Sequence, residues 1–207
     1  MFKIALFTAA LVAFANGRVT NGTCPEKVDL KANFDATQYT GIWYQVMRDK
    51  IATGENGNCP QTRYTLQADG KLKVFNSQFD NATQTLSNAG GVATCNGAQC
   101  GVYFNEYVTN ADYRVLDTDY LNYAIVYSCN PAIKRESMWI LSRARYPDQK
   151  YVDHALSLIF QRVPGYYFDN FAISYQGSAC QYYPTNVGHT HSHSHSHSHS
   201  QSDNFLN

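Results

Sequence analysis

Between residues 41 and 143 the chain alternates apolar and polar positions in short runs that are separated by turn signals. Alternation with a period of two is typical of β-strands with one buried face. The dipeptide Asp69-Gly70 favours a tight hairpin between two of these runs. Because few connections are long enough for a helix, the spacing predicts an antiparallel sandwich or up-and-down barrel rather than a parallel sheet. After a first strand that starts at Gly41, we expect strands at residues 63–66, 72–78, 86–94, 101–108, 113–117, 122–128 and 137–142.

One helix is expected after these strands. Apolar residues recur at helical spacing over residues 152–160, Asp148 lies near the start of the run, and Pro164-Gly165 ends it. A helix with one apolar face is expected to lie outside the sheet and to pack against it. Residues 172–175 are expected to add a last short strand.

The two ends of the chain differ from the strand-rich part. Lys3 and the apolar residues 4–14 predict a signal peptide at residues 1–17, with cleavage after Ala15 or Gly17. This apolar run is too short to span a bilayer, and no later run approaches that length, so we expect a secreted, extracellular protein without a transmembrane segment. Residues 18–184 are then expected to form one domain, and the histidine-rich residues 185–207 a disordered tail.

Charge and cysteine content narrow the class of protein further. Without Lys3 the chain has 15 basic and 16 acidic side chains, which argues against nucleic acid or anionic membranes as partners. Six cysteines in a secreted chain predict three disulfides, for which about 15 pairings are open. A cysteine metal site is disfavoured because the chain has no CxxC pair and no thiol flanked by histidine. Sequons at Asn21 and Asn81 predict glycosylation.

Three motifs occur in a fixed order along the chain. In Gly41-Ile42-Trp43, glycine permits a bend and the indole can close one end of a small barrel. Thr118-Asp119-Tyr120 precedes a predicted strand that ends near Cys129, and Arg143 follows the last predicted strand just before the helix. With these motifs, over roughly residues 24–180, the chain resembles the lipocalins, and among them the group of apolipoprotein D and the bilin-binding lipocalins.

The resemblance implies an all-β fold, an eight-stranded antiparallel up-and-down β-barrel around a ligand cavity, with one C-terminal α-helix packed outside. It also implies a cation–π contact of Arg143 over Trp43, worth about 1 kcal/mol. The residues with a structural role would be Gly41, Trp43, Thr118, Asp119, Tyr120 and Arg143. The implied disulfides are Cys24–Cys129 and Cys59–Cys180, and Cys95 and Cys100, which have no counterpart in that scheme, would then pair with each other.

Strand alternation predicts which side chains face the cavity. With Trp43 inward, Gln45 and Met47 are expected to point inward as well, and with Arg143 inward, so are Leu141 and Trp139. The hairpin at Gly70 and the resemblance supply the other inward positions, which include Val102 and Ala124. The predicted ligand-binding residues are Met47, Thr62, Tyr64, Val74, Asn76, Phe104, Tyr113, Val115, Val126 and Trp139.

A cavity lined in this way would be apolar and aromatic with few polar groups, which suits a flat or elongated hydrophobic molecule. We therefore expect a secreted carrier of a small hydrophobic ligand such as a lipid, steroid, retinoid or bilin, with no required cofactor. The alternative is a filled barrel that acts as a scaffold or interaction protein. Catalysis is not expected, because every cysteine has a proposed disulfide partner and His154 lies on the external helix. The oligomeric state stays open.

The histidine tail suggests another alternative, a secreted metal-binding protein. Alternating histidines project to one side of an extended chain, so several imidazoles can meet one Zn, Cu or Ni ion. The tail could instead only confer solubility, or become cationic below about pH 6.5. The histidines concerned are His189, His191, His193, His195, His197 and His199.

Overall fold

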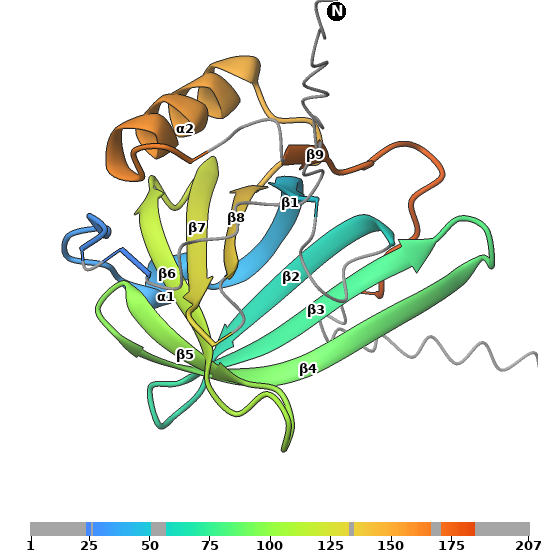
Figure 1. Cartoon of the computed structure of the whole chain (residues 1–207). Helices are drawn as coiled ribbons and strands as arrows, with labels where there is room; N and C mark the ends of the chain where they lie inside the picture. The colour runs from blue at the N-terminus through green and yellow to red at the C-terminus, as the bar shows by residue number, and fades with distance from the viewer. Residues whose placement is uncertain (1–23, 26, 51–56, 133–134, 167–170, 185–207) are drawn as a thin grey trace, which may run out of the picture.

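The computed structural model describes residues 24–25, 27–50, 57–132, 135–166 and 171–184, and strands dominate it (Figure 1). The predicted signal peptide, the sequon at Asn21 and the histidine tail lie outside these residues. The elements are α1 (Ala36–Tyr39), β1 (Gly41–Asp49), β2 (Asn58–Leu66), β3 (Leu72–Asp80), β4 (Thr85–Asn96), β5 (Gln99–Tyr103), β6 (Ala111–Thr118), β7 (Tyr123–Asn130), β8 (Arg135–Ser142), α2 (Gln149–Arg162) and β9 (Phe171–Ile173).

The sheet closes on itself as a barrel. Strands β2 to β8 pair in chain order, and β1 pairs with both β8 and β2, always antiparallel. The eight strands β1–β8 therefore form the closed antiparallel barrel that was expected. Strand β1 pairs with β2 over residues 41–44, and its residues 47–49 pair with β9. There Gln176 Nε2 donates to the backbone oxygens of Gln45 (2.9 Å) and Pro60 (2.8 Å), so the C-terminal segment bridges β1 and β2 where they diverge.

Helix α2 lies against the outside of the barrel, as expected (Figure 1). It begins where the Asp148 carboxylate accepts a hydrogen bond from the Lys150 backbone N–H, which satisfies a free donor at the helix start. Val152, Ala155 and Ile159 form its buried face and recur every three or four residues. The helix contacts β6 and β7, so it covers the outer face of these two strands.

Strand alternation produces two separate apolar clusters. The inner cluster contains Trp43, Tyr64 and Val126, whereas the outer cluster contains Ile125 together with Ala155 and Ile159 of α2. Neighbouring residues of β7 thus face opposite sides, which is the pattern expected of a strand with one side in the barrel and the other under a helix.

The prediction that Met47 points into the barrel is wrong. Gln45 lies opposite Leu141 of the inner cluster, but the register of β1 against β8 then shifts, and Met47 lies opposite Ile140. Both Met47 and Ile140 belong to the outer cluster. The cause is a β-bulge, because one extra residue in a strand reverses the alternation beyond it. Arg48, opposite Trp139, takes the inward position instead.

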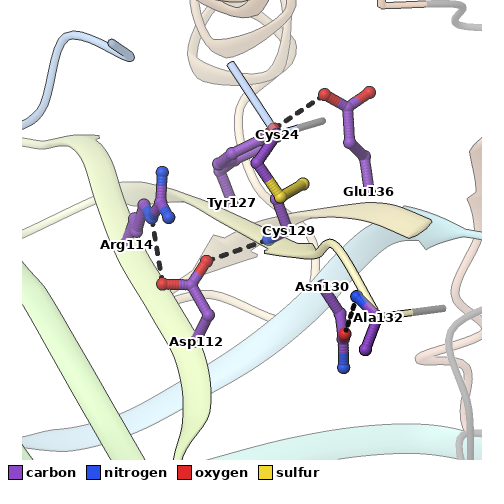
Figure 2. The surroundings of a disulfide bond; sticks show 8 residues. All are labelled: Cys24, Asp112, Arg114, Tyr127, Cys129, Asn130, Ala132 and Glu136. Atoms are coloured by element: carbon purple, nitrogen blue, oxygen red, sulfur yellow. Dashed lines mark hydrogen bonds and ion pairs between the residues drawn. A yellow bond between two sulfur atoms is a disulfide. The ribbon is translucent and has the colours of Figure 1, made fainter. Parts of the chain in front are cut away.

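The three disulfides are those implied by the resemblance, Cys24–Cys129, Cys59–Cys180 and Cys95–Cys100, and no cysteine of the described chain is free. Figure 2 shows the first of them at the end of β7. There the Asp112 carboxylate accepts hydrogen bonds from Arg114 Nε and from the Cys129 backbone N–H, both at 2.9 Å. The disulfide thereby fixes Cys24 to the end of β7, which the hydrogen bond to Asp112 of β6 holds in place.

Candidate functional site: the barrel interior

Arg143 and Trp43 close one end of the barrel. The guanidinium carbon of Arg143 lies 3.7 Å from the centroid of the Trp43 ring, which is fully buried, so the expected cation–π contact is present. The same guanidinium donates to the backbone oxygens of Tyr120 (2.9 Å), Ile42 (2.8 Å) and Gln38 (3.0 Å). Arg143 therefore joins α1, β1 and the turn before β7 beneath the indole.

The turn that precedes β7 is built by hydrogen bonds to its own backbone. The Asp119 carboxylate accepts from the backbone N–H groups of Leu121, Asn122 and Tyr123. Burial raises the pKa of Asp119, but these bonds and one from the Asn122 side chain outweigh it and hold the pKa below its ordinary value. Asp119 therefore stabilises this turn, whereas the partly buried Tyr120 packs against the inner cluster.

Three tyrosine hydroxyls meet inside the closed end. The Tyr113 hydroxyl lies 2.8 Å from the hydroxyls of both Tyr39 and Tyr64. Burial raises the pKa of Tyr39 and of Tyr113 well above 10, so both stay neutral and keep their hydrogen-bonding protons. Tyr64 and Tyr113 were predicted to face inward, but Tyr39 was missed because it precedes the first strand. Its place two residues before the Gly41 bend is the signal that could have found it.

One row of directly paired residues runs from the closed end to solvent. Trp43 pairs with Thr62, Thr62 with Asn76, and Asn76 with Ala89, so all four share the inner face of β1 to β4. Trp43 is fully buried, Thr62 and Asn76 are half-buried, and Ala89 is exposed. Solvent therefore reaches the inner face of the barrel from the side of β4.

The rest of the inner face is apolar and aromatic. Val102, Val115 and Val126 are buried in the inner cluster, whereas Phe104 and Trp139 pack against that cluster and stay partly exposed. Two large aromatic side chains thus combine an inward position with access to solvent. Of the predicted ligand-binding residues, the inner cluster and the paired row bring together Thr62, Tyr64, Val74, Asn76, Phe104, Tyr113, Val115, Val126 and Trp139.

Strand β4 contributes space rather than side chains. Its inward positions, two residues apart, are Ser87, Ala89, Gly91 and Ala93. A Cβ at Gly91 would lie 2.7 Å from the Tyr103 backbone oxygen and 2.9 Å from the Phe104 ring, so only glycine lets this backbone and this ring lie so close to β4. Sequence reasoning missed this face because a run of small residues shows no apolar alternation.

Two hollows of about 230 and 520 Å³ lie on the outer face of β4 and β5, and Thr94, Gly101 and Asn110 line both. They lack the apolar lining of the inner face, so we regard the interior as the better ligand site. Within the described ranges, no group of three His, Cys, Asp or Glu side chains is placed to hold a metal ion. None of the described helices has the length and apolar content that a membrane span requires.

Comparisons with known proteins agree with this geometry. The family model described as lipocalin-like domain matches residues 34–176. Apolipoprotein D of Cavia porcellus is 35% identical over 167 residues, which cover 77% of this chain and 87% of the relative. Insecticyanin-B of Manduca sexta is 28% identical over 200 residues, 89% of this chain and 94% of the relative.

The solved structure of insecticyanin from the tobacco hornworm Manduca sexta superposes with a TM-score of 0.65 at 25% identity, covering 78% of this chain and 90% of that one. Lipocalins are ligand-binding carriers rather than enzymes, in agreement with the expectation that no catalytic site is present. The match to the family model spans both ends of the barrel and all three motifs. The chain belongs to the lipocalin family.

Proposed function

We propose that this protein is a secreted carrier that binds one small hydrophobic molecule inside the barrel. The observation that carries the proposal is the paired row from Trp43 to Ala89, in which burial falls steadily along one inner face. A filled barrel would bury such a row throughout. The half-buried rings of Phe104 and Trp139 supply aromatic surface for a flat or elongated ligand.

The expected affinity follows from the apolar lining. A ligand that buries about 500 Å² of apolar surface gains about 12 kcal/mol from that burial, and a cost of about 4 kcal/mol for its lost freedom in solution leaves about 8 kcal/mol. Micromolar binding therefore needs no charged contact. Binding by apolar burial suits a lipid, steroid, retinoid or bilin, and the relatives named apolipoprotein D and insecticyanin support that range of ligands.

Quenching of tryptophan fluorescence tests the proposal. Trp43 is fully buried and Trp139 is half-buried, so a bound ligand should quench Trp139 first. Delipidated protein titrated with oleate, progesterone, retinol or biliverdin should show saturable quenching by at least one of them. The variant Trp139→Phe should lose most of that signal while its circular dichroism stays unchanged. Folded protein with no quenching by any of the four would favour the filled barrel.

A second function is supported by the six alternating histidines of the tail, which lies outside the described residues. Neutral imidazoles at every second position suit Zn or Cu. Calorimetric titration of the full chain with zinc should show micromolar binding that disappears when all six are changed to glutamine. If that variant binds zinc equally well, the tail is not the site. Secretion itself is tested by expression in cells and detection of processed protein in the medium.

A further inference from the structure

The amide of Asn76 is held in one orientation on the inner face. Thr62 lies directly opposite it in the β2–β3 pair, and the Thr62 hydroxyl donates to Asn76 Oδ1 at 2.9 Å. Because the oxygen of the amide is turned toward β2, its nitrogen Nδ2 is turned away from that strand. The amide thus presents its N–H donors rather than its acceptor to whatever occupies the interior.

These donors have no partner among the residues that the structure describes. No described group accepts a hydrogen bond from Asn76 Nδ2. A fully buried nitrogen without a partner would count among the buried unsatisfied atoms, and Asn76 Nδ2 does not, so solvent reaches it. Asn76 is half-buried, and its paired residue on β4, Ala89, has a side chain too short to cover the amide. Water can therefore satisfy the amide in the empty protein, and a bound ligand must replace that water.

A ligand without an oxygen would leave the amide unpaired and lose roughly tenfold in affinity. A carboxylate would gain little here, because the row from Trp43 to Ala89 carries no charge. Arg143 lies against the Trp43 ring, but it donates to three backbone oxygens, and the inward Arg48 lies five residues beyond Trp43 on β1, about 16 Å along that strand. Neutral donors without a cation directed at them favour an uncharged acceptor.

We propose that Asn76, oriented by Thr62, is a hydrogen-bond anchor that selects apolar ligands carrying an uncharged carbonyl oxygen. The proposal rests on the carrier function and refines it, because it names the chemical class of the ligand. It assigns Thr62 a positioning role, since its hydroxyl holds the amide of Asn76 in this orientation.

Three polyenes of the same skeleton test the anchor by tryptophan quenching. All-trans-retinal carries an uncharged carbonyl, axerophthene carries a methyl group in its place, and retinoic acid carries a carboxylate. The full chain should bind retinal about tenfold more tightly than either of the others. Asn76→Leu keeps the size of the side chain and should weaken retinal binding about tenfold, while axerophthene binds equally or better. Thr62→Val should weaken retinal binding about threefold.

The matched control is Lys73→Gln, on the exposed outer face of the same strand, which should leave all three affinities unchanged. If Asn76→Leu weakens all three polyenes by the same factor, Asn76 supports the wall and does not select the ligand. Equal binding of all three by the unaltered protein would refute the anchor and leave the carrier function standing. Absence of any saturable quenching by the three polyenes would contradict both proposals.

Discussion

Of the charged side chains that solvent reaches, Arg143 should lower the free energy of unfolding most when it is replaced. Arg143→Ala removes the contact 3.7 Å above Trp43, worth about 1 kcal/mol. It also removes three hydrogen bonds to backbone oxygens, each worth about 1 kcal/mol net. We therefore expect the free energy of unfolding to fall by about 4 kcal/mol. Arg143→Lys keeps the charge, but its compact ammonium cannot reach all three of the separate backbone oxygens that the planar guanidinium spans, so we expect a loss of about 2 kcal/mol.

Urea unfolding with the disulfides intact measures both losses. For a slope of about 2 kcal/mol per molar urea, the midpoint should fall by about 2 M for Arg143→Ala and 1 M for Arg143→Lys. The slope itself should not change, because the same surface is exposed on unfolding. Acrylamide should reach Trp43 in the alanine variant, since the guanidinium no longer covers the indole. Lys73→Gln, which removes an exposed cation, should shift the midpoint by less than 0.25 M, about 0.5 kcal/mol.

A loss below about 1 kcal/mol for Arg143→Ala would refute this reasoning. It would mean that the three backbone oxygens are as well satisfied by water and that the indole needs no cover. An equal loss for the lysine and alanine variants would instead show that the planar fork of hydrogen bonds matters and that the cation–π contact adds nothing.

Three further predictions concern stability. Changing both Cys95 and Cys100 to serine should cost about 2 kcal/mol in urea unfolding, less than half the cost of about 5 kcal/mol for the disulfide that closes 105 residues, because a short loop restrains the unfolded chain less. Met47→Ala should lower the free energy of unfolding by about 1–2 kcal/mol but leave ligand affinity unchanged, since Met47 packs in the outer cluster; weaker binding would place it inside after all. Asp119→Asn should destabilise the protein at pH 7, and the difference from the unaltered protein should vanish as pH falls below about 4 through the lowered native pKa, as pH-dependent urea midpoints would show; a constant difference would contradict the role of its charge.

The strands, the hairpin and the helix could be predicted from the sequence because their determinants are local, whereas the choice of a barrel over a sandwich came from the resemblance. A glycine before an inward tryptophan, an Asp-Gly hairpin and a helix ended by Pro164-Gly165 each act over a few residues. The pairing of cysteines and the contact of Arg143 with Trp43 came from the resemblance rather than from spacing. Both are long-range contacts that no local pattern fixes.

The interior was predicted less completely. Alternation identifies inward residues only while the register is regular, and the bulge before Met47 has no signal in the residue pattern. Tyr39 was missed because it lies on the short helix α1, outside the period of the strands. Ala89 was missed because its contribution is the absence of a large side chain. The site thus depends on the register of the strands and on the small side chains of β4, and both become apparent only when the strands are paired.

The most direct test of the account is to fill the interior and the outer hollow separately with the same side chain. Ala89→Phe adds a ring on the inner face beside Asn76, whereas Thr94→Phe adds one in the hollows outside β4. Binding of the best quenching ligand would be measured for both variants by fluorescence and by native mass spectrometry. The account predicts one ligand per chain for Thr94→Phe, with unchanged affinity, and loss of binding for folded Ala89→Phe. Loss of binding in Thr94→Phe, with Ala89→Phe unaffected, would contradict the interior as the site.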